Sequence, residues 1–179
     1  MSRPSPKTPV TRVESFPPQV GDGCRLLVLG TAPSRASLAL RQSYGHAQNL
    51  FWPFMGALFD AGPEHPYAER IRRLHARGIG IWDVFASCER PGSLDRAIVP
   101  ASEVPNDIAG LLAEQPTIRT IVLNGGKAQQ AFRRHILAAA GPHWPTGICL
   151  LDLPSTSPAN ASMTRAGKLA RWRIVLDHA

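Results

Sequence analysis

A stretch of nine residues, "YGHAQNLFW" from Tyr44 to Trp52, places an aromatic hydroxyl, an imidazole and an amide directly before two further aromatic rings. An imidazole can pass a proton, an amide can hold a water molecule or read the edge of a base, and an aromatic ring can stack on a flat ligand. Tyr44, His46 and Asn49 are therefore candidates for binding and catalysis. Each also has a structural interpretation: Tyr44 as a half-buried aromatic, His46 as a structural, hydrogen-bonded histidine, and Asn49 as the cap of a following helix.

The elements that position these side chains follow from the hydrophobic pattern. Short apolar runs separated by helical patterns predict a parallel sheet that helices cover on both faces. The expected strands are Arg25–Gly30, Ile79–Phe85, Ile118–Gly125 and a fourth within "GICLLDL". Residues 1–23, rich in Pro, Ser, Thr and Gly, are expected to form a flexible arm, and residues 88–106 a long loop. Residues 24–179 then form a single α/β domain.

The ligand of such a sheet binds beyond the carboxyl ends of its strands. Four loops meet at that edge, and they carry hydroxyls, amides, one carboxylate and aromatic rings. Their candidate residues are Thr31, Ser34, Ser37, Tyr44, His46, Asn49, Trp82, Asp83, Asn124, Lys127, Ser155, Thr156, Ser157, Asn160 and Ser162. Hydroxyls bind phosphates, rings stack on bases, and amides and carboxylates read base edges, so this set favours a nucleic-acid ligand.

Composition points the same way. The net charge of +7 creates a positive field that attracts polyphosphates.

No apolar run is long enough for a membrane span, and no secretion signal begins the chain, so a cytoplasmic protein is expected. Three scattered cysteines and six histidines show no metal-binding spacing. Three familiar motifs are absent. "NGGKA" lacks the spacing of a phosphate loop, "GIGIWD" lacks that of a dinucleotide fingerprint, and "PGSLD" lacks that of a nucleophile elbow. No metal and no cofactor is predicted.

Four segments of the chain carry a resemblance to a known family. In chain order they are "LLVLGTAPSRASL", "YGHAQNLFW", "GIGIWDVFASCERPGSLDRAI" and "LPSTSPANAS". Together they resemble the hypoxanthine-DNA glycosylase branch of the uracil-DNA glycosylase superfamily, from Phe16 to Trp172. The resemblance implies a three-layer α/β/α sandwich with a central four-stranded parallel sheet. It also implies a monomeric enzyme without cofactor, whose partner is DNA that contains a deaminated base.

The resemblance assigns roles to individual residues of the first loop. Asn49 matches the catalytic amide of an H-x-x-N-x-F-W segment, although the chain has Ala and Gln where the family usually has Pro and Arg. His46 would donate to the leaving base or to a phosphate. Tyr44 occupies the place of a ring that stacks on the flipped base. Ala32 stands where many branches carry the acid or amide that holds the catalytic water, so their mechanism does not transfer directly.

The remaining loops supply base-binding and phosphate-binding candidates. Asp83 sits where several branches read the base edge, Trp82 beside it would line the pocket, and Ser155 replaces a histidine of the second motif. The predicted phosphate contacts are Ser34, Ser37, Lys127, Ser157 and Ser162. No lysine is placed for a Schiff base, so no strand-cleaving activity is expected.

The predicted function is a monofunctional DNA glycosylase of base excision repair, which hydrolyses the N-glycosidic bond of hypoxanthine in deoxyinosine and leaves an abasic site. One alternative keeps the enzyme and changes the substrate to uracil or another deaminated base. A second is a DNA-binding protein of the same fold without turnover, which Ala32 favours and Asn49 opposes. A third is an enzyme on free nucleosides or nucleotides, which the net charge of +7 opposes.

Overall fold

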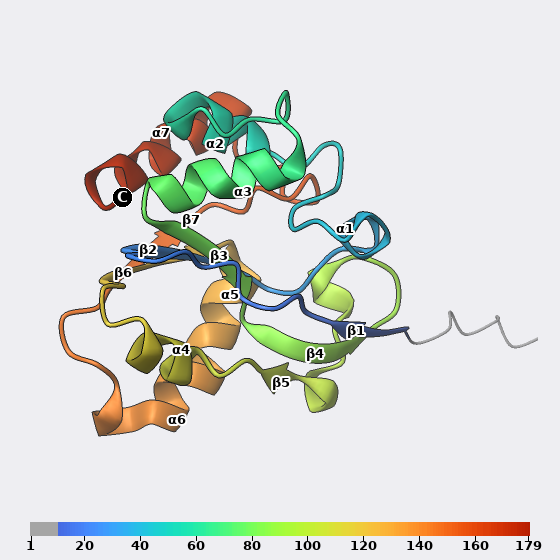
Figure 1. Ribbon diagram of the computed structural model, residues 1–179. Coiled ribbons are helices and arrows are strands. Elements are labelled where there is room, and N and C mark those ends of the chain that lie inside the picture. Colours follow the sequence, from blue (N-terminus) through green and yellow to red (C-terminus); the bar gives the residue numbers. More distant parts are fainter. Residues whose placement is uncertain (1–10) are drawn as a thin grey trace, which may run out of the picture.

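The central element of the computed structural model, which describes residues 11–179, is a four-stranded parallel sheet. Its strands are β2 (Leu26–Gly30), β3 (Ile79–Asp83), β6 (Thr120–Asn124) and β7 (Cys149–Leu153), in the spatial order β3-β2-β6-β7 (Figure 1). All three pairings are parallel. The sheet predicted from the four apolar runs is therefore confirmed.

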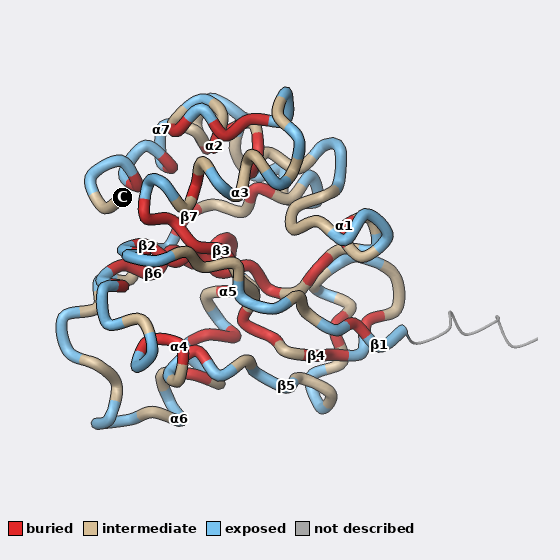
Figure 2. The backbone as a smooth tube through the Cα atoms, viewed as in Figure 1, coloured by how far each residue is buried: buried red, intermediate tan, exposed pale blue. Residues whose placement is uncertain are grey.

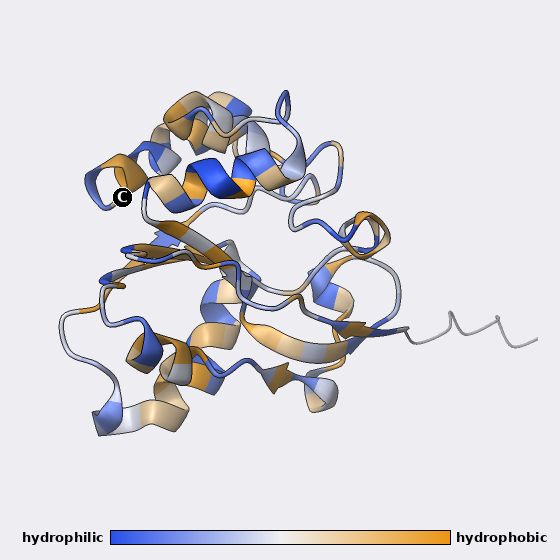
Figure 3. Cartoon of the chain, in the orientation of Figure 1, coloured by the Kyte–Doolittle hydropathy of each residue, from blue (hydrophilic) through white to orange (hydrophobic). Residues whose placement is uncertain are grey.

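Three helices cover one face of this sheet: α2 (Phe51–Phe59), α3 (Tyr67–Ala76) and α7 (Arg165–Trp172) (Figure 1). Leu26 and Val28 of β2 belong to the same buried cluster as Phe51 and Phe54 of α2 and Trp172 of α7. Hydrophilic residues lie along the outer side of α3, away from the sheet (Figure 3). This amphipathic pattern is the one expected for a helix that packs on a sheet.

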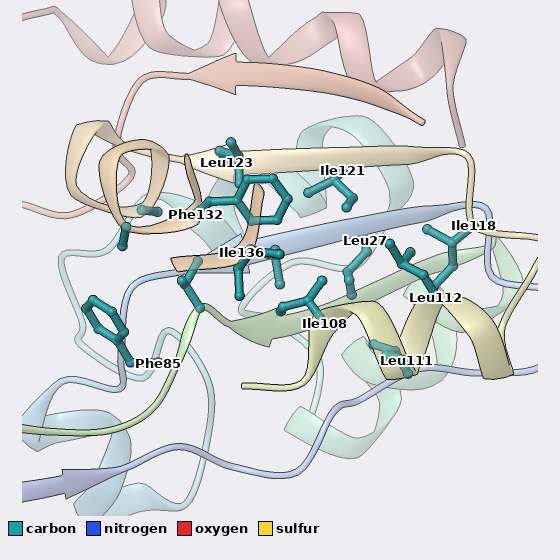
Figure 4. Close-up of a cluster of buried hydrophobic side chains, with 14 of the residues drawn as sticks. Leu27, Phe85, Ile108, Leu111, Leu112, Ile118, Ile121, Leu123, Phe132 and Ile136 are labelled. Atoms are coloured by element: carbon teal, nitrogen blue, oxygen red, sulfur yellow. The ribbon is translucent and has the colours of Figure 1, made fainter. Parts of the chain in front are cut away.

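The opposite face is covered by α4 (Ile108–Glu114), α5 (Gly126–Ala131), the π-helical residues Phe132–Leu137 and α6 (Ala138–Ala140). Leu27 of β2 points to this side, where it packs with Ile108, Leu112 and Ile136 (Figure 4). Successive side chains of a strand point to opposite faces, so burial on both sides explains why β2 is continuously apolar. Figure 2 shows the buried residues running along the sheet and the inner sides of the helices. The predicted three-layer sandwich is confirmed.

A second, antiparallel sheet differs from the prediction. β4 (Phe85–Arg90) pairs with β1 (Thr11–Glu14) on one side and β5 (Val104–Pro105) on the other. Part of the predicted long loop is therefore a strand, and the packed chain begins before residue 24. Val13 of β1 is buried in the same hydrophobic cluster as Phe85 and Cys88 of β4, and the ladder to β4 gives the backbone of Thr11–Glu14 its hydrogen-bond partners. The part of the predicted arm from residue 1 to 10 lies outside the described residues.

Short elements complete the described chain. They are α1 (Arg35–Leu40) and the 3-10 turns Asp95–Ala97, Pro100–Ser102, Gly141–His143 and Arg173–Asp177. Within residues 11–179, no helix combines the length and the apolar composition that crossing a membrane requires.

Candidate active site at the carboxyl edge of the sheet

A cleft lies where the loops after β2, β3, β6 and β7 meet, as the strand-end rule predicts. Its deeper part is lined by Gly30, Thr31, Ala32, Pro33, Ser34, Ser37, Ser43, Tyr44, Asn49, Trp82, Asp83, Arg90, Ser93, Asp95, Asn124, Ser155, Thr156 and Ser157. An outer part adds Leu94, Arg96, Gly125, Gly126, Lys127, Ala159 and Asn160 and shares Thr31, Asp95 and Ser155 with the deeper part. Most of the side chains predicted from the sequence therefore come together in one place.

Two predicted site residues do not line this cleft. His46 is exposed, and its Nδ1 accepts a hydrogen bond from the backbone N–H of Gln48 at 3.1 Å. Ser162 is exposed on a shallow part of the surface, and its hydroxyl donates to Oδ1 of Asn160 at 2.8 Å. A ligand in the cleft would reach either residue only by extending beyond the lining described above.

Asn49 lies in the cleft and its side chain also binds the backbone at the start of a helix, although the N-cap position itself is Leu50. Its Oδ1 accepts from the backbone N–H of Phe51 at 2.9 Å, at the start of α2. The next backbone N–H, of Leu50, donates to the carbonyl oxygen of Thr156 at 2.9 Å. The loop after β7 therefore fixes where the Asn49 amide stands. The capping bond leaves one lone pair of Oδ1 and the two Nδ2 donors for a ligand.

Tyr44 is held in an unfavourable backbone conformation that directs its side chain into the cleft. Its φ is +57°, a region that costs a residue with a Cβ roughly 1–2 kcal/mol. The ring stacks on Phe51 with 3.9 Å between centroids and 21° between planes. Its hydroxyl is buried and has no hydrogen-bond partner among the described residues. Burial, and then the nearby Asp83 carboxyl, raise the pKa of the Tyr44 hydroxyl, so it stays a hydrogen-bond donor. One ring face is thus occupied by Phe51, and the unpartnered hydroxyl is available to a ligand.

Asp83 stands at the end of β3 and faces Gly30, its partner in β2. A Cβ on Gly30 would lie 2.6 Å from Oδ1 of Asp83 and 3.2 Å from the Tyr44 hydroxyl, so only glycine leaves room for both groups. Burial raises the pKa of Asp83 to about 7, the negative charge of Asp95 adds to this, and Arg90 partly offsets it. Near neutral pH the Asp83 carboxyl is therefore present in both its neutral and its charged form.

A buried arginine and a second acid belong to the cleft, and neither was among the sequence candidates. The Arg90 side chain, 1% exposed, donates from Nη2 to the carbonyl oxygen of Pro33 at 2.5 Å, and its Nη1 lies 3.5 Å from Oδ1 of Asp95. The Arg90 Nε is buried without a partner among the described residues. The sequence gives little signal for them, because Ser87 and Arg90 are polar residues at buried positions of β4.

A third unexpected residue, Lys168 of α7, holds the loop after β7. This lysine is 2% exposed, and its amine donates to the carbonyl oxygens of Ser155 at 2.7 Å and Asn160 at 2.6 Å. Trp172 of the same helix donates from Nε1 to the carbonyl oxygen of Pro154 at 2.9 Å. Burial lowers the pKa of Lys168. The basic closing helix therefore shapes the cleft from behind rather than only facing solvent.

Several predicted phosphate-binding groups have partners within the protein. Ser34 caps α1 by accepting from the N–H of Ser37 at 3.1 Å, and the buried Ser37 hydroxyl accepts from the N–H of Gly45 at 3.0 Å. Ser157 donates its N–H to the Ser155 hydroxyl at 3.1 Å. The Ser34 and Ser37 hydroxyls also lie 3.0 Å apart, so one donates to the other and only one of the two can donate to an anion.

Lys127 is paired with a buried acid. Its amine lies 2.6 Å from Oε1 of Glu103, whose other oxygen lies 2.7 Å from Nε2 of His135. Burial alone would raise the pKa of Glu103, but hydrogen bonds from Lys127 and His135 bring it below its ordinary value. A phosphate that approached Lys127 would compete with this ion pair.

One group of possible metal ligands lies outside the cleft. Asp60, Glu64 and His65, after the end of α2, bring one ligand atom each within 4.8 Å of one another. Asp60 and Glu64 are exposed, and none of the three lines the cleft.

The fold and the cleft define an α/β/α protein with a polar cleft at the carboxyl edge of a four-stranded parallel sheet. The model of the Uracil DNA glycosylase superfamily matches residues 17–177. The chain therefore belongs to the uracil DNA glycosylase superfamily, and the resemblance to its hypoxanthine branch is confirmed.

Similar proteins come from methanogenic archaea. A protein of Methanosarcina acetivorans named "Hypoxanthine DNA glycosylase" is 32% identical over 164 residues, which cover 91% of this chain and 97% of that protein. A protein of the same name from Methanosarcina barkeri is 31% identical over 156 residues, 87% of this chain and 92% of its own length. A solution NMR structure from Methanosarcina acetivorans, provisionally described as a uracil DNA glycosylase, superposes with a TM-score of 0.76 at 30% identity and covers 94% of this chain and 98% of its own.

Proposed function

We propose that this protein is a monofunctional DNA glycosylase of base excision repair, which removes hypoxanthine from deoxyinosine and leaves an abasic site. The observation that carries the proposal is that Tyr44 and Asn49, from one loop, line a single cleft with Asp83, which comes from a separate strand end. Membership of the superfamily and two relatives named "Hypoxanthine DNA glycosylase" support it. The net charge of +7 favours DNA as the ligand. Basic side chains that neutralise DNA phosphates release their counterions, and this release strengthens binding.

The target base has to leave the helix to enter a cleft of this kind. Flipping costs a few kcal/mol, and less for a weakly paired deaminated base. Stacking on the free face of the Tyr44 ring would recover roughly 1–3 kcal/mol. The unpartnered Tyr44 hydroxyl would gain a hydrogen bond on binding, which removes the cost of its burial without a partner.

Asp83 is proposed to read the edge of the base. Deaminated bases carry a ring N–H beside a carbonyl oxygen. The Asp83 carboxyl can accept from that N–H in either form, and in its neutral form it can also donate to the neighbouring oxygen. A pKa of about 7 keeps the neutral form populated near neutral pH.

Asn49 is proposed to orient the attacking water. The C1′–N bond breaks with both electrons leaving on the base, and the sugar becomes positively charged. Water adds its oxygen to C1′ and gives up a proton, and the departing base takes up a proton from solvent. Because the Asn49 side chain is fixed at the start of α2, its free amide groups can hold a water at a constant position. Positioning of this kind can supply a large part of the rate enhancement.

Base release from short labelled duplexes tests the proposal. Each duplex contains one deoxyinosine or one deoxyuridine, and abasic sites are cleaved with alkali after incubation. Natural protein should cleave the deoxyinosine strand, and Asn49→Ala should reduce the single-turnover rate by about 10²–10³ while still binding the duplex. Absence of base release from both duplexes, with tight binding to them, would instead identify a DNA-binding protein without turnover.

Uracil is the second candidate substrate. The Asp83 carboxyl can bind uracil as well as hypoxanthine, since both bases present a ring N–H beside a carbonyl oxygen. Ser155 in place of the histidine of the second motif argues against strong uracil release, because a serine stabilises a developing base anion less. The deoxyuridine duplex in the same experiment separates the two substrates. Competition by long undamaged DNA separates both from an enzyme on free nucleosides.

A further inference from the structure

The loop after β2 has no acid at Ala32, but Arg90 connects the next residue of this loop, Pro33, to the carboxyl of Asp95. Thr31, on the other side of Ala32, lines the cleft together with Asp95. The Pro33 carbonyl oxygen accepts from Arg90 Nη2 at 2.5 Å, and Arg90 Nη1 lies 3.5 Å from Oδ1 of Asp95. Arg90 therefore links the Asp95 carboxyl to the loop that contains Ala32.

Asp95 is open to a ligand although its partner arginine is not. The Asp95 side chain is 40% exposed, whereas the Arg90 side chain is 1% exposed. Asp95 lines both the deeper and the outer part of the cleft, at the junction between them. The Asp95 carboxylate therefore contacts the buried Arg90 on one side and faces the cleft on the other, so it can contact a ligand bound there.

We propose that Asp95 is the catalytic carboxylate of the glycosylase reaction and that Arg90 is its positioning residue. This inference rests on the proposed function and adds the group that accepts the proton. As the C1′–N bond breaks, the Asp95 carboxylate stabilises the positive sugar. When the water oxygen bonds to C1′, one water proton passes to Asp95 and is later released to solvent, and the base takes its proton from solvent. Asn49 holds the water and Asp83 holds the base.

The surroundings of Asp95 suit a proton acceptor. Burial raises the pKa of Asp95, while Thr31 and the charges of Arg90 and Lys127 lower it. The other titratable groups that interact with it are Asp83, Tyr44 and Cys88. A carboxylate whose pKa lies above its ordinary value accepts a proton more readily than a fully solvated one.

A structural role for Asp95 is the competing explanation, since it could serve only as counter-ion to the buried Arg90. Loss of the partner of a buried charge destabilises a protein but does not change which group accepts a proton. The two roles are separated by the pH profile, by chemical rescue and by a matched variant. Asp60→Asn is that control, because Asp60 also pairs with an arginine, Arg73, but is exposed outside the cleft.

The experiment measures single-turnover hypoxanthine release from a deoxyinosine duplex between pH 5 and 9. The rate of the natural protein should rise with pH as the proton acceptor becomes charged, and Asp95→Asn should abolish this rise. Asp95→Asn should also reduce the rate about 100-fold or more and change the duplex affinity by less than about threefold. Added formate should restore part of the rate in Asp95→Ala by replacing the missing carboxylate. Asp60→Asn should behave as the natural protein.

Four outcomes overturn the inference. If Asp95→Asn keeps the natural rate, or if it loses activity only in step with stability and formate does not rescue Asp95→Ala, then Asp95 is not the proton acceptor and the proposed function stands. Asp95 is also not the proton acceptor if Asp95→Asn has a lower rate but keeps the pH profile of the natural protein; the proposed function stands in that case too. If the natural protein releases no base from any duplex, the proposed function and this inference both fail.

Discussion

Asn124 and Thr156 exchange two hydrogen bonds across the carboxyl edge of the sheet. Nδ2 of Asn124 donates to the Thr156 hydroxyl at 2.9 Å, and the backbone N–H of Thr156 donates to Oδ1 of Asn124 at 3.0 Å. Both residues are buried. Because the Thr156 carbonyl oxygen also accepts from the N–H of Leu50, this pair connects the end of β6, the loop after β7 and the start of α2. The position of Asn49 therefore depends on an amide and a hydroxyl that need not touch substrate.

Thr156→Val should separate this positioning role from catalysis. Valine keeps the shape of threonine but leaves Nδ2 of Asn124 buried without its acceptor, so we expect a loss of about 1–3 kcal/mol in unfolding free energy. Hypoxanthine release should fall as well, since the Asn49 loop is held through residue 156. Urea unfolding and single-turnover excision measure the two effects. Thr117→Val, at an exposed position, is the control and should change neither. Equal behaviour of the two variants would contradict the prediction.

Lys168→Met should affect activity more than stability. Methionine fills similar volume without the cost of burying a charge, so the unfolding free energy should change by less than about 2 kcal/mol. The carbonyl oxygens of Ser155 and Asn160 lose their shared donor, and the loop between them should become looser. We expect at least a tenfold loss in kcat/KM on a deoxyinosine duplex. A variant as active as the natural protein would show that α7 does not set the loop geometry.

The sequence predicted the parallel sheet and the cleft for a physical reason. β2 and β6 are buried on both faces, so their strands are visible as apolar runs, and polar residues at strand ends of one sheet must lie at one edge. β4 was missed because Ser87 and Arg90 are polar residues at buried positions. Arg90 and Lys168 were missed for the same reason: a buried charge is acceptable only where the fold supplies partners from distant segments, which composition and spacing do not reveal.

Gly30→Ala should disrupt the floor of the cleft. The new Cβ would lie 2.6 Å from Oδ1 of Asp83, so this buried carboxyl has to move, and the Tyr44 hydroxyl has little room to follow. Overpacking of this kind costs about 1–3 kcal/mol in stability. Because a displacement of about 1 Å can cost 10²-fold in rate, excision should also fall by one to two orders of magnitude. Gly126→Ala, where no atom lies within 4 Å of the added Cβ, is the stability control and should unfold like the natural protein.

Asp83 should make the stability of the protein fall as pH rises. Its pKa is about 7 in the folded protein, against an ordinary value of 3.8, because burial disfavours the charged form and the charge of Asp95 adds to the effect. Between about pH 4 and pH 7 the folded protein keeps a proton that the unfolded chain releases, so the Asp83 contribution to stability decreases across this window and is lowest above pH 7.

Asp83→Asn removes this dependence because the amide does not titrate. The stability of Asp83→Asn relative to the natural protein should therefore increase from pH 4 to pH 8, by about 2–4 kcal/mol for a shift of this size. Urea unfolding of both proteins at unit pH steps measures the difference. Asp22→Asn, which alters an exposed acid, should show no such trend. A relative stability of Asp83→Asn that stays constant, or that is greatest at acid pH, would mean that Asp83 is ionised in the folded protein well below pH 7 and reads the base only as an acceptor.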